Sequence, residues 1–360
     1  MTYILGIESS CDETAAAVVI DGKTIASSVI ASQIDLHAQY GGVFPEVASR
    51  AHIEAISAVV DQALRDAGVP YATLDGIAVT QGPGLVGSLL VGINYAKGLA
   101  LSLNKPLMGV NHLEGHVYSL WLTQPFREVV FPVVVLIVSG GHTELLLMRG
   151  HGHYERLGGT IDDAAGEAFD KVGRMLNLPF PGGPHIEQSG LKGNPSAYNF
   201  PRAKRDDSYD FSFSGLKTAV MREVMVKPSG DTRKSDNKAD KKSQLRADIS
   251  VNDVAASFQE ALVDILVSKT SRAAKVYEAT EIFLSGGVSA NQRLRALMKK
   301  ETDLPVRYPP LALCTDNAAM IAAAAHYRYG EALKRGAIST DLGMDVRTMW
   351  SLSEMNKLSS

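Results

Sequence analysis

Two histidines spaced four residues apart are the first feature of this sequence that could do chemistry. His112 and His116 lie in the segment Asn111–His116 (NHLEGH). On a helix this spacing puts both imidazoles on one face, where they can share a metal ion. A zincin peptidase needs a glutamate directly after the first histidine, and Leu113 stands there instead. Because short motif matches carry false positives, two surface or capping histidines stay the structural alternative.

A carboxylate near the other end of the chain could complete such a site. Asp316 lies in Cys314–Asn317 (CTDN), just ahead of an alanine-rich segment that is expected to be helical. Two histidines and one carboxylate with open coordination positions suit iron(II) or zinc. Aspartate is also a good helix N-cap, so a capping role for Asp316 remains open beside the metal role.

Glycine loops form a second group of candidates. Ser139–Gly141 and Ser285–Gly287 each follow an apolar strand, and such loops let backbone N–H groups approach phosphate or ribose oxygens. Asp170 and the loop Pro181–Glu187 add carboxylates of the kind that receive ribose hydroxyls. A plain structural turn explains each loop equally well when it is taken alone.

The elements that must position these residues alternate between strands and helices. Tyr3–Ile7 and Ala15–Ile20 are apolar runs on either side of a polar loop, and Val133–Val138 and Glu144–Met148 repeat that pattern. Strands and helices also alternate between and after these pairs, which indicates a mixed sheet with helical cover. The repeat predicts an α/β protein with two related lobes.

The composition of the chain limits the classes of protein to which it can belong. The chain has 360 residues, 45% of them hydrophobic and 21% charged, as in soluble globular proteins. Apolar runs such as Phe131–Val138 stop short of the roughly 20 residues that cross a bilayer, so no membrane role is expected. Two cysteines and an N-terminus without a basic, cleavable leader favour the cytoplasm. The net charge of −3 means that nucleic-acid binding would need a local basic patch or a partner.

One segment differs from the rest. Residues 227–248 are rich in lysine, aspartate and serine, with Leu245 as the only large aliphatic residue. Such a segment buries too little apolar surface to offset its ordering entropy, so a disordered insertion is predicted there. Contact of this insertion with tRNA is the alternative interpretation.

Nine motifs spread along the chain resemble those of the TsaD/Gcp family, tRNA adenosine threonylcarbamoyltransferases once described as O-sialoglycoprotein endopeptidases. They are Gly6–Thr14 (GIESSCDET), Gly82–Val86 (GPGLV), Asn111–His116 (NHLEGH), Val138–Thr143 (VSGGHT), Gly166–Lys171 (GEAFDK), Phe180–Pro184 (FPGGP), Phe211–Lys217 (FSFSGLK), Ser285–Val288 (SGGV) and Cys314–Asn317 (CTDN). The insertion 227–248 departs from the family pattern, since it looks longer and more basic.

The resemblance implies the actin/Hsp70/sugar-kinase-like fold with a nucleotide cleft between the lobes. Lobe I would comprise residues 1–131, completed by 318–345, and lobe II residues 132–317. The metal, one per subunit and iron(II) before zinc, would be held by His112, His116 and Asp316. The implied ligand contacts are Ile137, Val138, Ser139, Gly140, Gly141, Asp170, Gly183, Glu187 and Asn291.

The implied reaction moves threonylcarbamoyl from threonylcarbamoyl-AMP to adenosine 37 of tRNAs that read codons beginning with A. Asp12 or Glu13, on the first polar loop, is the hypothesis for proton removal or substrate positioning. Cys11 has no histidine placed by sequence to activate it as a nucleophile. The expected partners are a TsaB-like paralogue and a TsaE-like ATPase. A small-molecule kinase of the same fold, a metallopeptidase and a non-catalytic scaffold are the competing interpretations.

Overall fold

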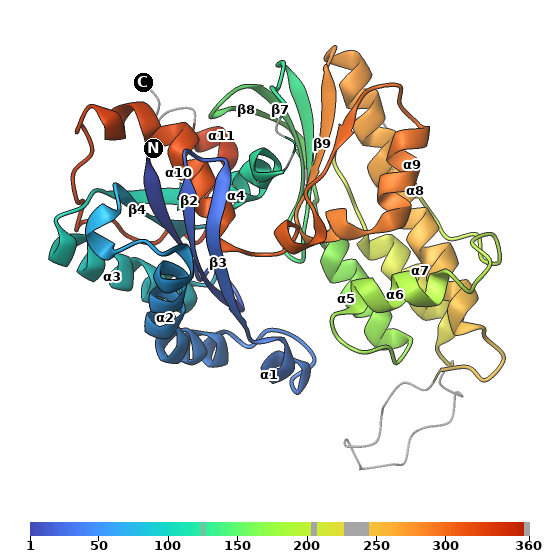
Figure 1. The fold of residues 1–360 in the computed structure, drawn as a ribbon. Helices are drawn as coiled ribbons and strands as arrows, with labels where there is room; N and C mark the ends of the chain where they lie inside the picture. Colours follow the sequence, from blue (N-terminus) through green and yellow to red (C-terminus); the bar gives the residue numbers. More distant parts are fainter. Residues whose placement is uncertain (124, 126, 203–206, 227–244, 356–360) are drawn as a thin grey trace.

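The computed structural model describes residues 1–360 except 124, 126, 203–206, 227–244 and 356–360. The described chain forms two five-stranded sheets with helices around them (Figure 1). The first sheet has the strand order β3 (Thr24–Ser32), β2 (Glu13–Ile20), β1 (Tyr3–Glu8), β4 (Gly76–Gly82) and β5 (Leu107–Asn111). The second has the order β10 (Val306–Arg307), β9 (Glu281–Ser285), β6 (Val133–Val138), β7 (Thr143–Gly150) and β8 (His153–Gly159).

The two sheets repeat one topology. Strand β1 pairs antiparallel with β2 and parallel with β4, and β6 pairs in the same way with β7 and β9. The outer strands agree as well, because β3 and β8 are antiparallel to their neighbours while β5 and β10 are parallel. The predicted repeat is therefore a pair of equivalent hairpins in two related lobes. The exact lobe boundaries stay predictions.

The sheet of lobe I is buried on both faces. Leu5 and Ile7 of β1 pack with α2 (Pro45–Ala67) and α3 (Val86–Leu103), whereas Ile4 packs with α4 (His112–Tyr118) and α10 (Ala318–Lys334). Successive side chains of a strand point to opposite faces, so a strand covered on both faces is apolar throughout. This explains the unbroken apolar run of β1.

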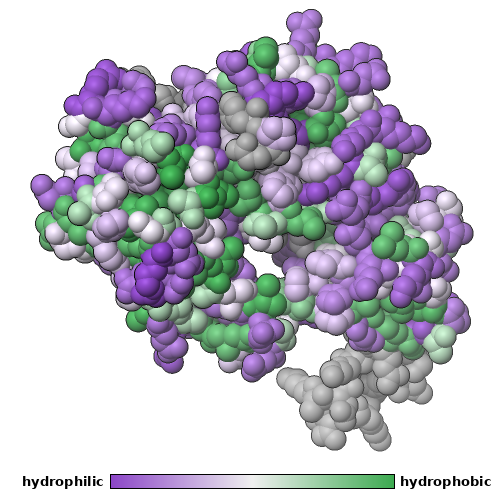
Figure 2. All heavy atoms as spheres, in the orientation of Figure 1, coloured by the Kyte–Doolittle hydropathy of each residue, from purple (hydrophilic) through white to green (hydrophobic). Residues whose placement is uncertain are grey.

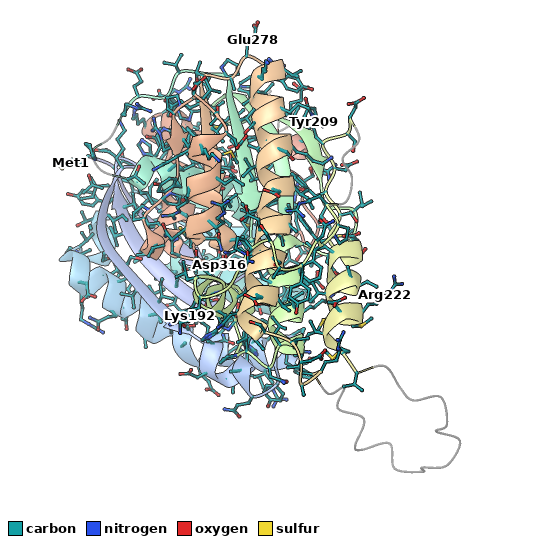
Figure 3. The ribbon with its side chains drawn as sticks, turned by 90° about the vertical axis from the view of Figure 1, so that its right-hand side faces the viewer. Met1, Lys192, Tyr209, Arg222, Glu278 and Asp316 are labelled. Carbon is teal, nitrogen blue, oxygen red and sulfur yellow. The ribbon has the colours of Figure 1, made fainter. Side chains whose placement is uncertain are left out.

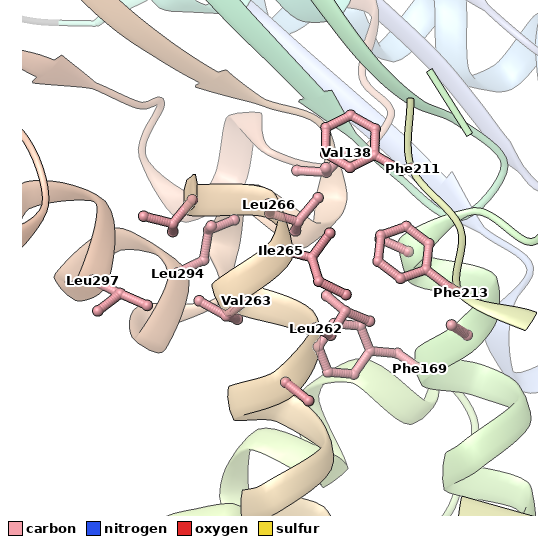
Figure 4. Close-up of a cluster of buried hydrophobic side chains, with 14 of the residues drawn as sticks. Val138, Phe169, Phe211, Phe213, Leu262, Val263, Ile265, Leu266, Leu294 and Leu297 are labelled. Atoms are coloured by element: carbon pink, nitrogen blue, oxygen red, sulfur yellow. The ribbon is translucent and has the colours of Figure 1, made fainter. Parts of the chain in front are cut away.

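The sheet of lobe II likewise separates two clusters of buried side chains. One face carries the core shown in Figure 4, in which Val138 lies beside Phe211 and the same cluster includes Phe169 and Leu262. The helices of this face are α5 (Ala165–Met175), α6 (Gly182–Gly190), α7 (Ser214–Val224), α8 (Val251–Val276) and α9 (Gln292–Lys300). The other face, through Val135, shares its cluster with α4 and α10. These two helices thus form a middle layer between the sheets.

Short elements complete the described chain. They are α1 (Ile34–Ala38), η1 (Tyr71–Thr73), η2 (Ser119–Leu122), η3 (Gly287–Ala290), η4 (Leu311–Leu313) and α11 (Leu352–Met355). Most of the predicted insertion 227–248 lies outside the described residues, so its disorder stays a prediction. At its borders Met225 and Leu245 form an antiparallel bridge.

One helix among the described residues, α3, is long and apolar enough to span a membrane by length and composition alone. Core helices of soluble proteins pass the same test. Packing accounts for one side of α3, which lies against β4 and α2 and contributes Leu89, Ile93 and Ala96 to the buried interior, whereas Val86, Leu90 and Leu101 are exposed.

Candidate metal and nucleotide site

Three parallel strands of lobe I end at one place, and each brings a polar residue there. Glu8 ends β1, Thr80 lies near the end of β4, and His112 follows β5 directly. Carboxyl ends of neighbouring parallel strands meet at one edge of a sheet, which is where α/β proteins build their sites. Asn111 caps α4, since its side chain accepts hydrogen bonds from the backbone N–H groups of Leu113 at 2.9 Å and Glu114 at 3.3 Å.

The predicted metal triad is assembled in the folded chain. The Nε2 atoms of His112 and His116 lie 3.5 Å and 3.1 Å from Oδ1 of Asp316, and the two rings are 4.7 Å apart between centroids. Asp316 lies in the middle of the molecule (Figure 3). The alternative capping role belongs to Asn317, whose side chain accepts the N–H of Met320 at 3.0 Å.

The three side chains fit one divalent cation. Within the described part of the chain Nε2 of the buried His116 lies 3.1 Å from Oδ1 of Asp316 without making a hydrogen bond, and a cation held between the two atoms would give this nitrogen a partner. Ligand atoms bound about 2.1 Å from one ion lie about 3.0–3.4 Å from each other in octahedral or tetrahedral geometry. The two histidine–aspartate separations, 3.5 Å and 3.1 Å, are close to that range, and one ligand atom per residue lies within 4.8 Å of the others.

The charged groups at the triad shift one another's pKa values toward the ionised forms. Burial lowers the pKa of His112, but the carboxylates of Asp316 and Glu8 raise it to about 9. Burial raises the pKa of Asp316, but His112 and His116 lower it by a larger amount. The pKa of Asp316 therefore lies well below its usual range. The pKa of Glu8 is lowered too, because His112 outweighs the effect of burial. A metal would have to displace the His112 proton to bind.

The first polar loop lies beside the triad. Burial, Asp12 and Asp316, in that order of effect, raise the pKa of Glu13 to about 9. Glu13 also accepts a hydrogen bond from the Ser32 hydroxyl at 2.9 Å. Burial and the same acidic neighbours raise the pKa of the Cys11 thiol above its usual range, which is contrary to what a thiolate nucleophile needs.

A cavity of about 210 Å³ lies in lobe II. Glycines and a few polar groups line it, and one of its lining residues, Thr315, directly precedes Asp316 in the chain. The lining residues are Gly140, Gly166, Phe169, Asp170, Pro181, Gly183, Pro184, Glu187, Gly287, Val288, Ala290, Asn291 and Thr315. In the space-filling view the surface is hollowed between the two lobes (Figure 2).

Close backbone packing explains two of the glycines around this cavity. A Cβ at Gly166 would lie 2.6 Å from the carbonyl oxygen of Ser139, and one at Gly182 would lie 2.5 Å from that of Phe169. Only glycine lets α5 approach the loop at Ser139 and lets α6 approach α5 this closely. Gly183 differs, since a Cβ there meets no atom of the described residues within 4 Å.

Known proteins resemble this chain over almost its whole length. The family model TsaD, tRNA N6-adenosine threonylcarbamoyltransferase, matches residues 24–323. The tRNA N6-adenosine threonylcarbamoyltransferase of Thermomicrobium roseum is 53% identical over 95% of both chains, and that of Bacillus subtilis is 49% identical over 98% of both. This chain belongs to the TsaD family. The family assignment confirms the resemblance found in the nine sequence motifs.

Solved structures of more distant proteins show the fold of this TsaD family member. The (R)-2-hydroxyglutaryl-CoA dehydratase component A of Acidaminococcus fermentans is 15% identical, with a TM-score of 0.52 over 92% of this chain and 100% of that one. HypF of T. kodakarensis is also 15% identical, with a TM-score of 0.60 over 92% of this chain and 48% of its own. The predicted actin/Hsp70/sugar-kinase-like fold is confirmed.

The structure brings together five of the nine predicted ligand contacts of this TsaD family member. Gly140, Asp170, Gly183, Glu187 and Asn291 all line the cavity. Three of them already have protein partners: Asp170 accepts the N–H of Gly182 at 2.7 Å, and Glu187 accepts that of Gln292 at 2.5 Å. The third is Asn291, which caps α9 by accepting the N–H of Leu294 at 2.9 Å.

The other four predicted contacts do not line the cavity. The side chains of Ile137 and Val138 are fully buried in the two cores, so they could meet a ligand only through their backbone. Ser139 uses its hydroxyl to accept the N–H of His142 at 3.1 Å, and Gly141 lies in the same turn. A ligand role for all nine residues stays a prediction.

Sequence reasoning missed several residues of the site. Phe169 and Thr315 line the cavity, and Glu8 and Thr80 stand behind His112. One feature of the sequence could have indicated Glu8, because this charged residue ends an apolar strand. An acidic side chain that is buried there needs hydrogen-bonding or charged partners. Phe169 and Thr315 lay inside quoted motifs, but nothing in the motifs showed which residue faces the cavity.

Proposed function

We propose that this TsaD family member transfers the threonylcarbamoyl group from threonylcarbamoyl-AMP to the exocyclic amine of adenosine 37 in tRNAs that read codons beginning with A. The new bond joins N6 of the adenine to the carbamoyl carbon, the mixed anhydride bond to phosphate breaks, AMP leaves and the amine loses a proton. The observation that carries the proposal is the cavity of lobe II, one of whose lining residues, Thr315, directly precedes Asp316 of the triad.

The cavity in lobe II suits the adenylate half of the donor. Phe169, Pro181 and Val288 supply apolar walls, while Asp170 and Glu187 supply carboxylates of the kind that accept ribose hydroxyls. Gly140 and Gly287 leave room for phosphate oxygens near the backbone. Binding there would place the reactive anhydride toward Thr315 and the triad.

His112, His116 and Asp316 would hold the metal, with iron(II) as our proposal and zinc second. When bound, the cation supplies a positive charge that polarises oxygens of the donor as they gain negative charge. Glu13 would donate a hydrogen bond and Asp12 would accept the proton of the amine. Burial and the neighbouring carboxylates of Asp12 and Asp316 raise the pKa of Glu13, which suits hydrogen-bond donation, and we assign acceptance of the amine proton to Asp12.

A partner surface is also proposed, for a TsaB-like paralogue that works in the cytoplasm together with a TsaE-like ATPase. Helices α2 and α3 form an exposed groove, and Ile53, 64% exposed, and Leu90, 39% exposed, line it. Exposed apolar grooves of this kind mark protein contacts. Replacing Ile53 by aspartate should abolish co-purification with the paralogue while metal content is kept.

A direct assay tests the proposed reaction. The purified chain and partners are incubated with threonylcarbamoyl-AMP and unmodified tRNA, and nucleosides are analysed for N6-threonylcarbamoyladenosine. Product should form with wild type and be lost with His116→Ala. A wild-type protein that yields no product, under conditions where a known enzyme of the family does, would refute the proposal. Phosphoryl transfer from ATP to a small alcohol would favour the kinase interpretation instead.

A further inference from the structure

Glu8 is a fully buried carboxylate that contacts a predicted metal ligand. It ends β1, next to β4, and its side chain has no solvent exposure. Its Oε1 accepts the backbone N–H of Ser10 at 2.5 Å, and its Oε2 accepts the hydroxyl of Thr80 at 2.6 Å. The same Oε2 lies 3.0 Å from Nδ1 of His112. A buried carboxylate is costly unless it is fully hydrogen-bonded, and this one is.

The contacts of Nδ1 decide which nitrogen of His112 is free for a metal. A second group, the hydroxyl of Ser10, lies 3.1 Å from Nδ1, and a hydroxyl can either donate or accept. Ser10 alone would therefore permit both tautomers. An ionised carboxylate only accepts, so Glu8 requires the proton to sit on Nδ1. Nε2, the atom that faces Asp316, then keeps its lone pair for coordination.

Thr80 keeps Glu8 in this role. A threonine hydroxyl has one proton to donate, and Thr80 gives it to the oxygen that faces His112. The oxygen is thereby held in place from the neighbouring strand. His116 has no comparable support, because within the described residues Nδ1 of that ring has no hydrogen-bond partner.

We infer that Glu8, held by Thr80, is a positioning residue for metal binding: it fixes His112 as the Nδ1–H tautomer and aims Nε2 at the cation. The inference rests on the metal site of the proposed function. It gives the triad one histidine whose Nδ1 is held by a carboxylate, and one, His116, whose Nδ1 has no hydrogen-bond partner among the described residues. Carboxylates behind metal-bound histidines also raise the basicity of the coordinating nitrogen.

Metal affinity of the apo protein tests the inference without any tRNA. Zinc(II) and cobalt(II) are titrated against a competing chelator for wild type, Glu8→Gln, Thr80→Val and the control Glu281→Gln. Glu281 is also a buried carboxylate, 6% exposed, but it pairs with Arg307 at the far sheet edge of lobe II. Loss of a partner of this kind costs about 10–100-fold in metal affinity.

We expect Glu8→Gln to weaken binding in that range, because its amide N–H₂ can donate to Nδ1 and allow the wrong tautomer. Thr80→Val should weaken binding by a smaller factor, and Glu281→Gln should leave it unchanged. The visible spectrum of the cobalt(II) form should also change in Glu8→Gln, which a merely structural role of Glu8 would not produce. Thr80→Val serves as the test if Glu8→Gln does not fold.

Three outcomes are decisive. Equal metal affinity and equal cobalt spectra for wild type, Glu8→Gln and Thr80→Val would overturn the role of Glu8. A wild-type protein that binds metal and loses it in Glu8→Gln, yet makes no modified nucleoside, would support Glu8 and refute the proposed reaction. Absence of metal binding in wild type would overturn both.

Discussion

The guanidinium of Arg328 donates two hydrogen bonds to the carboxylate of Glu114, from Nε at 2.8 Å and from an Nη atom at 2.7 Å. Glu114 lies on α4 between the two histidines, and Arg328 lies on α10, the helix that begins just after Asp316. Both side chains are nearly or fully buried. This ion pair therefore joins the two helices of the middle layer that carry the metal triad.

Removing one partner of this pair should be more harmful than removing both. Arg328→Met would leave a buried carboxylate unpaired, which costs about 3–5 kcal/mol of folding stability. Glu114→Gln combined with Arg328→Met should recover part of that loss, because no uncompensated charge remains. Urea denaturation of the two variants and wild type measures this, and equal stability of the single and double variants would contradict it.

Metal should stabilise the folded chain through the triad. A ligand that binds only the folded state at 100 times its dissociation constant adds about 2.7 kcal/mol. The melting temperature of wild type should therefore rise with added zinc or iron(II) and fall again with chelator. Neither the metal nor the chelator should change the melting temperature of His116→Ala or Asp316→Ala. Metal-dependent stabilisation that survives in both variants would place the metal elsewhere.

Asp12 and Glu13 should differ in their effects on the reaction. If Asp12 takes the amine proton, Asp12→Asn should slow single-turnover transfer by about 10²–10⁴-fold, the usual contribution of a general base. Glu13→Gln keeps a hydrogen-bond donor and should slow it much less. Tight binding of AMP in both variants is the control. Equal rates for wild type and Asp12→Asn would exclude the base role.

The spacing of the two histidines made their part of the metal site predictable from sequence. Four-residue spacing on a helix brings His112 and His116 together whatever the rest of the fold does. The approach of Asp316 depends on α10 packing in the middle layer, so spacing left its two roles open, and Asn317 took the cap. Glu8 was missed because its partners Thr80 and His112 come from other elements of lobe I, and only the strand order joins them.

The fold was predictable where a pattern repeated. The strand, loop and strand units at Tyr3–Ile20 and Val133–Met148 revealed the twin hairpins. The long helices α2 and α8 were not assigned from sequence. Helix α8 is buried over most of its circumference, so it lacks the one-sided apolar stripe by which a surface helix is recognised.

The cavity in lobe II can be filled from one glycine without disturbing the fold. A Cβ at Gly183 meets no atom within 4 Å in the part of the chain that the structure describes, and Gly183 lines the cavity, so the leucine side chain of Gly183→Leu should project into the ligand space. AMP affinity measured by calorimetry should fall by more than tenfold. Gly215→Leu is the matched control, since Gly215 is also the second residue of a helix, α7, with nothing near its Cβ position. Equal losses in both variants, or none in Gly183→Leu, would argue against this cavity as the nucleotide site.

Asp163 should make the stability of the protein depend on acid pH. Burial raises its pKa, but hydrogen bonds and charges from Lys171, at 2.7 Å, and Lys217 lower it more, so the folded-state pKa lies below the ordinary value. A lowered pKa means that the unfolded chain takes up the proton first. The contribution of Asp163 is therefore complete above its unfolded pKa of about 3.9 and is lost as pH falls through the folded value.

Asp163→Asn should accordingly lower the free energy of unfolding by about 1.5–3 kcal/mol at pH 7, the usual worth of hydrogen bonds to a charged group. The difference from wild type should shrink as pH is lowered from 5 toward 2, the acid range over which lowered carboxylate pKa values act. Denaturant unfolding across that pH range measures it. Asp303→Asn, which changes an exposed carboxylate, should show no such trend. A difference for Asp163→Asn that stays constant with pH would mean that the ion pairs with Lys171 and Lys217 do not stabilise the fold.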